Sequence, residues 1–372
     1  MFTSCKNNTE TSNSIITVSQ DKENIKASFD AMTTNLTQLR DGTFYQAMIE
    51  FLNVKNGEAL DADWADQLGN GLGDVIDGNN LTNNDRFNFS LLAGKYTWNS
   101  NSARWTKTSN STFLALFPSS KTSTINNCEL GITSYTDKQF VIDGETDYLP
   151  TAANAYLKKD NIQIASLGFS AGYNSQGFPT TVNAQLYLKP ITASASLAYK
   201  TDAEYSFNYS VVNENNKDNA LSLKSDVSFS NGITNYTSLN DVRINAIQLT
   251  LTQGKLTVSG TIDVKTLTEL ENSNVDITAS DINKTMNLEV LYNSQSIGTL
   301  KVEDIGNNLA LFVVYKDGTE ENTSIYYDSF ISNIKSAFES SIDASSVKSI
   351  IKNQVLKAKI QKIKNKVLFW KK

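Results

Sequence analysis

The sequence contains no histidine in 372 residues. The chain therefore cannot form a Ser-His-Asp or Cys-His catalytic set or a typical zinc site, and it lacks the commonest general base near neutral pH. Carboxylates, lysine and tyrosine remain as catalytic groups, so the absence argues against an enzyme without excluding one. We predict a non-catalytic protein with no metal and no cofactor.

Long hydrophobic runs and an excess of positive charge are also missing. No run of about 20 apolar residues occurs, so we predict no membrane-spanning helix. The net charge of −6 and the pI near 5.0 argue against a nucleic-acid partner, which normally requires a basic surface. Hydrophobic residues make up 40% of the chain and aromatic residues 10%, enough for a substantial folded core.

Three motifs with chemical potential fail on inspection. Gly168–Gly172 matches the letters of a hydrolase elbow, but it lies in an alternating strand pattern and no histidine follows. The acidic stretch from Asp61 to Asp85 lacks the ligand spacing of a calcium loop. Cys128 has one potential partner, Cys5: it is a free thiol if Cys5 is acylated and a disulfide candidate otherwise.

Cys5 gives the strongest indication of location. Phe2-Thr3-Ser4-Cys5 matches the end of a lipobox, in which small residues precede the cleavage site and the thiol accepts a diacylglyceryl group. Acyl chains contribute about 0.8 kcal/mol per buried methylene, so an acylated cysteine can hold a protein on a bilayer. We predict lipidation at Cys5 and a flexible tether over residues 1–20, with the upstream hydrophobic region missing from this sequence. The alternative is an ordinary N-terminus with an incidental cysteine.

The segment FTSCKNN resembles the mature start of many lipoproteins from the Bacteroidetes, whose secreted proteins are also rich in Asn, Thr and Tyr. The resemblance covers these residues and the composition, and it names no characterised family. It implies a lipid-anchored protein of the bacterial cell envelope, attached to the outer membrane. Surface-exported members carry an acidic cluster after the cysteine, whereas residues 6–10 here offer only Glu10, so the periplasmic and surface faces both stay open.

The hydrophobic pattern predicts an α+β fold with N-terminal helices, a large antiparallel β-sheet region and a C-terminal amphipathic helix. A helical stripe beginning at Ile25 and Phe29 predicts a helical segment over residues 21–80. Apolar residues then alternate with polar ones across short turns, which indicates an antiparallel β-rich body over 81–325. Helical spacing returns over 326–372, a segment with a basic end.

The C-terminal segment combines an apolar stripe with lysines. The stripe consists of Leu356, Ile360, Ile363, Val367 and Trp370, and the lysines around it are Lys357, Lys359, Lys362, Lys364 and Lys366. Such a basic amphipathic helix, with Trp370 near its end, can lie on an anionic membrane surface. The alternative is that the stripe packs on the sheet and the lysines are solvated.

These features predict a lipid-anchored envelope protein with a binding or scaffolding role. The alternative function is a periplasmic carrier of lipid or another hydrophobic ligand, held between a curved sheet and helices. In that case rows such as Tyr205, Phe207 and Tyr209 would line a cavity. A histidine-free carboxylate glycosidase, with a glycan ligand, is a third possibility, although the sequence identifies no acid pair.

Overall fold

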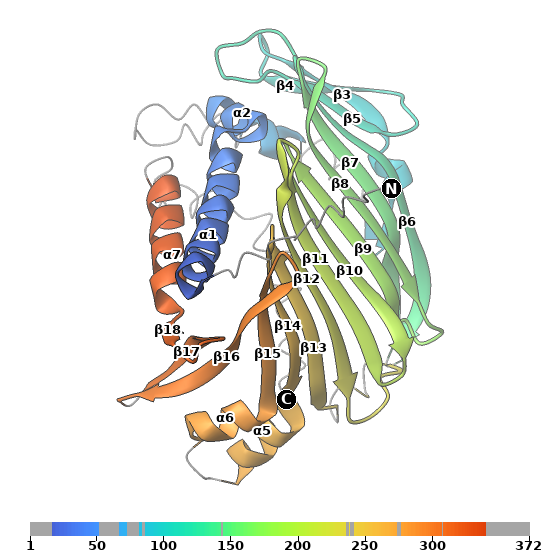
Figure 1. The fold of residues 1–372 in the computed structure, drawn as a ribbon. Helices are drawn as coiled ribbons and strands as arrows, with labels where there is room; N and C mark the ends of the chain where they lie inside the picture. Colours follow the sequence, from blue (N-terminus) through green and yellow to red (C-terminus); the bar gives the residue numbers. More distant parts are fainter. Residues whose placement is uncertain are drawn as a thin grey trace, which may run out of the picture.

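The structure is a computed structural model that describes residues 17–51, 67–72, 82–83, 86–142, 144–235, 238, 242–273, 277–306 and 308–339. These residues form N-terminal helices, a 16-stranded sheet and a C-terminal helix (Figure 1), which confirms the predicted α+β fold. Within the described residues no helix is long and apolar enough to cross a membrane.

The helices lie at both ends of the described chain and beside the last part of the sheet. They are α1 (Val18–Asp41), α2 (Thr43–Phe51), α4 (Phe89–Leu92), α5 (Val264–Asn272), α6 (Ala279–Thr285) and α7 (Ser324–Glu339), with a further helical turn over 67–72. The side chain of Thr17 accepts a hydrogen bond from the amide of Gln20, so Thr17 caps α1. That helix begins three residues before the boundary predicted from sequence.

The strands cover most of the chain between α2 and α7. They are β1 (Thr82–Asn83), β2 (Arg86–Phe87), β3 (Gly94–Asn99), β4 (Arg104–Thr108), β5 (Phe113–Phe117), β6 (Cys128–Ile142), β7 (Glu145–Lys159), β8 (Ile162–Tyr173), β9 (Pro179–Leu188), β10 (Ile191–Thr201), β11 (Glu204–Asn213), β12 (Asn216–Phe229), β13 (Ile244–Gln253), β14 (Leu256–Asp263), β15 (Met286–Tyr292), β16 (Gln295–Ile305), β17 (Asn308–Tyr315) and β18 (Glu320–Asn322).

Strands β5 to β18 form one antiparallel meander in which each strand pairs with its neighbours in sequence. The pattern changes only at one edge, where β3 pairs parallel to β5 and β4 is the outermost strand. Turns such as Asp160-Asn161 have positive φ at both residues, which suits tight connections between twisted strands. The long curved sheet in Figure 1 follows from this repetition.

The sheet has one apolar and one polar face, because successive side chains on a strand point to opposite sides. The register aligns apolar side chains into one row across eight neighbouring strands. That row runs Ala153, Phe169, Ala184, Ala195, Tyr209, Leu223, Leu251, Val258. The next row on the opposite face is polar, with Gln185, Ser194, Ser210 and Ser222 in register. We call the two sides the apolar face and the polar face.

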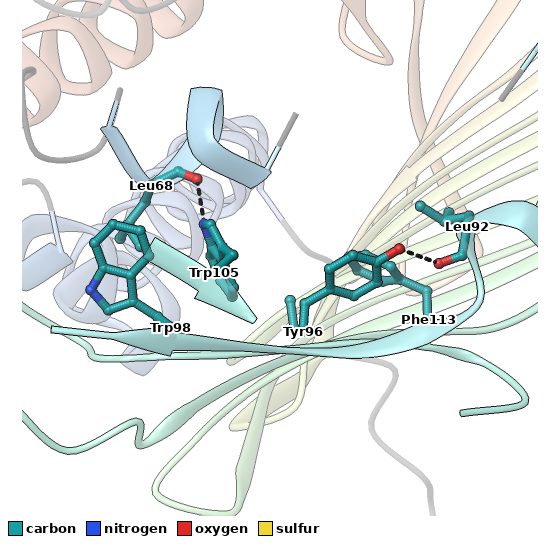
Figure 2. Close-up of a cluster of buried hydrophobic side chains, with 7 residues drawn as sticks. Leu68, Leu92, Tyr96, Trp98, Trp105 and Phe113 are labelled. Atoms are coloured by element: carbon teal, nitrogen blue, oxygen red, sulfur yellow. Dashed lines mark hydrogen bonds between the residues drawn. The ribbon is translucent and has the colours of Figure 1, made fainter. Parts of the chain in front are cut away.

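A buried aromatic cluster covers the apolar face over β3 to β6 (Figure 2). The hydroxyl of Tyr96 donates to the carbonyl of Leu92 at 2.9 Å, and the indole N–H of Trp105 donates to the carbonyl of Leu68 at 3.0 Å. Both buried polar groups are therefore satisfied, and the helical turn over 67–72 is fastened to the sheet.

A second cluster covers the same face over β14 to β17. Ile25 of α1 packs with Leu256, Val290 and Tyr315, and α7 contributes Tyr326. Helices α1 and α7 lie side by side on this part of the sheet (Figure 1). The helices thus bury the apolar face at one lateral end, as the aromatic cluster does at the other.

Helices α1 and α2 also run along one row of hairpin ends. In α1, the amide of Asn35 donates to the carbonyl of Asn219 at 2.8 Å, and Gln38 accepts a hydrogen bond from Asn213. Farther along, Glu50 of α2 forms an ion pair with Lys159 beside the β7–β8 turn. These polar contacts fix the helices to one end of the strands.

The joint between α1, α7 and β17 contains a charged group whose pKa can be tested. Glu321 accepts hydrogen bonds from Tyr326 and Tyr315 and pairs with Lys22 at 3.0 Å. Burial raises the pKa of Glu321, but these hydrogen bonds and Lys22 lower it more, so the pKa lies below its ordinary value of 4.5. The stabilisation is present above pH 4.5 and is lost as pH falls through the depressed value.

We therefore expect Glu321→Gln to lower the free energy of unfolding by about 2 kcal/mol at pH 7, because it removes charged hydrogen bonds. The difference from the wild type should shrink below pH 4.5. Urea unfolding at pH 7, 5 and 3.5 measures both values. A difference that stays constant over this pH range would contradict the assignment.

Candidate ligand-binding face

The centre of the apolar face is uncovered by the described residues. Six large apolar side chains there are 36–44% exposed, namely Leu167, Leu186, Phe207, Tyr209, Leu223 and Leu251. They come from β8, β9, β11, β12 and β13, with the alanines of β10 between them. We call these six residues the open floor.

The register explains why they share one surface. Tyr209 lies opposite Leu223, and Leu223 lies opposite Leu251, so these three form one continuous row. Leu167 and Leu186 form a pair in the adjacent row. A contiguous exposed apolar surface of this kind typically marks a site for a ligand, a membrane or another protein segment, whereas isolated exposed leucines need no explanation.

The open floor carries no charged side chain. The apolar-face positions around it in β8 to β13 are occupied by Leu, Phe, Ala, Val and Tyr, with Ser225 and Gln253 as the polar members. Charged side chains of the same strands, such as Lys224, lie on the polar face. This separation favours an uncharged hydrocarbon group as the ligand of the apolar face.

Structured elements border the open floor on all sides. The aromatic cluster lies beyond β7, and the cluster beneath α1 lies beyond β13. Helices α1 and α2 follow one row of hairpin ends. At the other row, Phe178 and Ile233 cover Tyr205 in a third buried cluster. From β8 to β13 the floor extends over five strand spacings, about 24 Å at ~4.8 Å each.

The other face carries the largest hollow seen in the described part of the chain. This hollow has a volume of about 680 Å³ and is wide open. Most of its lining residues, including Asn183, Asn208 and Ser222, belong to the polar face. It is therefore not the apolar cavity that the carrier hypothesis anticipated, and the apolar face is an open surface instead.

The remaining chemical groups form no reactive site. Cys128 is a free, buried thiol, and burial raises its pKa to about 11, so it stays protonated at neutral pH. Gly168–Gly172 lies inside β8, which agrees with the rejection of a hydrolase elbow. Among the described residues, no group of three or more Cys, Asp and Glu side chains could hold a metal ion.

The sequence-predicted site residues have different outcomes. Phe207 and Tyr209 lie on the open floor, whereas Tyr205 is buried with Phe178. Sequence reasoning did not single out Leu167 or Leu186 as site residues. The lipidation residue Cys5 and the predicted membrane contacts Lys357, Lys359, Lys362, Lys364, Lys366 and Trp370 lie outside the described residues.

Comparison with known proteins finds no match for this chain to any family model, curated protein or solved structure. Function must therefore be argued from the face itself.

Proposed function

We propose that this protein is a lipid-anchored protein of the bacterial cell envelope that holds the hydrocarbon chain of a lipid on its open floor. The proposal makes it a binding protein, not a catalyst. The observation that supports it best is the continuous, uncharged surface of six apolar side chains that the described helices leave exposed.

The size of the surface fits this ligand class. The open floor is about 24 Å long across the strands. One leaflet of a bilayer has a hydrocarbon depth of about 15 Å, half of the ~30 Å core. A lipid acyl chain can therefore lie along the floor over its whole length. Its burial contributes about 0.8 kcal/mol per methylene removed from water, which is the main driving force for binding.

Titration of the full chain with cis-parinaric acid, followed by its fluorescence, tests the proposal. We expect saturable binding that oleic acid displaces, because both ligands offer an uncharged chain to the same surface. Absence of saturable binding, or binding that oleic acid does not displace, would refute the hydrocarbon-binding role.

The proposed anchor has a separate test. Cells grown with a clickable palmitate analogue should incorporate the label into the wild-type protein, and Cys5→Ala should abolish it. Cys128→Ala is the matched control, because this buried thiol is not accessible to an acyl transferase. Label retained by Cys5→Ala would disprove anchorage at Cys5.

A further inference from the structure

The chain contains an apolar segment that fits the open floor. The sequence predicts that Leu356, Ile360, Ile363, Val367 and Trp370 form one side of a helix beyond the end of α7. A helix over 356–370 would be about 22 Å long at ~1.5 Å per residue. That length is close to the ~24 Å that the open floor spans across β8 to β13.

The segment can also reach the floor. Helix α7 ends at Glu339, and it packs on α1 through Phe330 and Phe29. Helix α1 in turn borders the open floor through the cluster around Ile25. Residues 340–355, when extended, span up to about 50 Å at ~3.3 Å each, twice the width of the floor.

The charge distribution favours this placement. The open floor carries no charge, and the lysines of the segment lie around the side opposite its apolar stripe, where they can stay in water. Residues 347–372 contain nine lysines and no acid, whereas the whole chain has a net charge of −6. The rest of the molecule is therefore strongly acidic, which attracts the segment at long range.

We propose that the apolar side of residues 356–370 docks on the open floor when no lipid is bound, and that a lipid chain displaces it. The second part of this proposal rests on the proposed lipid-binding function; the first part does not. The segment would shield the apolar surface from water and would make ligand affinity depend on a competing part of the same chain.

Disulfide trapping tests the docking directly. In a Cys5→Ser background, Leu223→Cys is combined with Ile360→Cys, and the matched control combines Ser222→Cys with Ile360→Cys. Ser222 precedes Leu223 on β12 but lies on the polar face. After mild oxidation, mass spectrometry of peptides should find at least tenfold more disulfide for the Leu223 pair. Equal yields, or no disulfide with Leu223, would overturn the docking.

Oleic acid separates the two proposals. If the segment docks and lipid displaces it, oleic acid should reduce the yield of the Leu223–Ile360 disulfide several-fold. A disulfide that oleic acid does not affect would leave the docking in place and refute displacement by lipid. Saturable oleic acid binding without any disulfide would refute the docking and leave the lipid-binding function in place. A segment bound instead to an anionic membrane would give that second result.

Discussion

Adding negative charge to the open floor with Leu186→Asp and Leu223→Asp together should reduce the affinity for cis-parinaric acid by at least about 100-fold. Covering a leucine side chain completely contributes about 1.5–3 kcal/mol. An aspartate in the same place also has to lose water against a hydrocarbon chain. A combined loss of about 3 kcal/mol corresponds to roughly 100-fold in affinity.

The same strands supply the control. Gln185→Asp with Ser222→Asp adds the same charge at neighbouring positions of β9 and β12, but on the polar face. We expect this variant to bind cis-parinaric acid like the wild type. Leu186 and Leu223 are 41% and 36% exposed, so their replacement leaves no buried charge that would unfold the protein. Equal losses for the two double variants would mean that the effect is electrostatic and does not arise from the apolar face.

Gly260→Ala should destabilise the sheet by about 3 kcal/mol or more, the upper range for forced overpacking. Gly260 lies in β14 at a φ of +156°, and a Cβ added there would overlap the backbone carbonyl oxygen of Asn287 in β15. Because this neighbour is backbone, it cannot rotate away, and the β14–β15 pairing would have to open.

Gly168→Ala is the matched control for this change. Gly168 lies in β8, where an added Cβ would meet only the side-chain oxygen of Asn154 at an ordinary 3.6 Å. We expect no loss of stability for that variant. Urea unfolding followed by circular dichroism measures both. A Gly260→Ala protein as stable as the wild type would show that β14 and β15 do not pair in the described register.

The sequence predicted the type of fold because alternation is visible within each strand. Tyr209 and Val211, or Leu221 and Leu223, reveal a strand with one apolar side. Alternation does not reveal which residue of one strand lies opposite which residue of the next, since that depends on turn lengths and bulges. The open floor is a property of this register, so its full composition could not be derived from the strands separately.

Two particular residues show the limit. Tyr205 belongs to the same alternating run as Phe207 and Tyr209, but the segments carrying Phe178 and Ile233 bury it. No sequence pattern predicts where such loops fold back. Leu167 was missed because β8 places Ala, Ser and Gly beside it, which blurs the alternation.

Native mass spectrometry of the full chain, purified from its host membrane without added lipid, tests the central claim most directly. We expect a mass increase that matches a bound lipid, retained in Gln185→Asp/Ser222→Asp and lost in Leu186→Asp/Leu223→Asp. A lipid-free mass for the wild type, or a bound lipid that survives both charges on the open floor, would contradict the account.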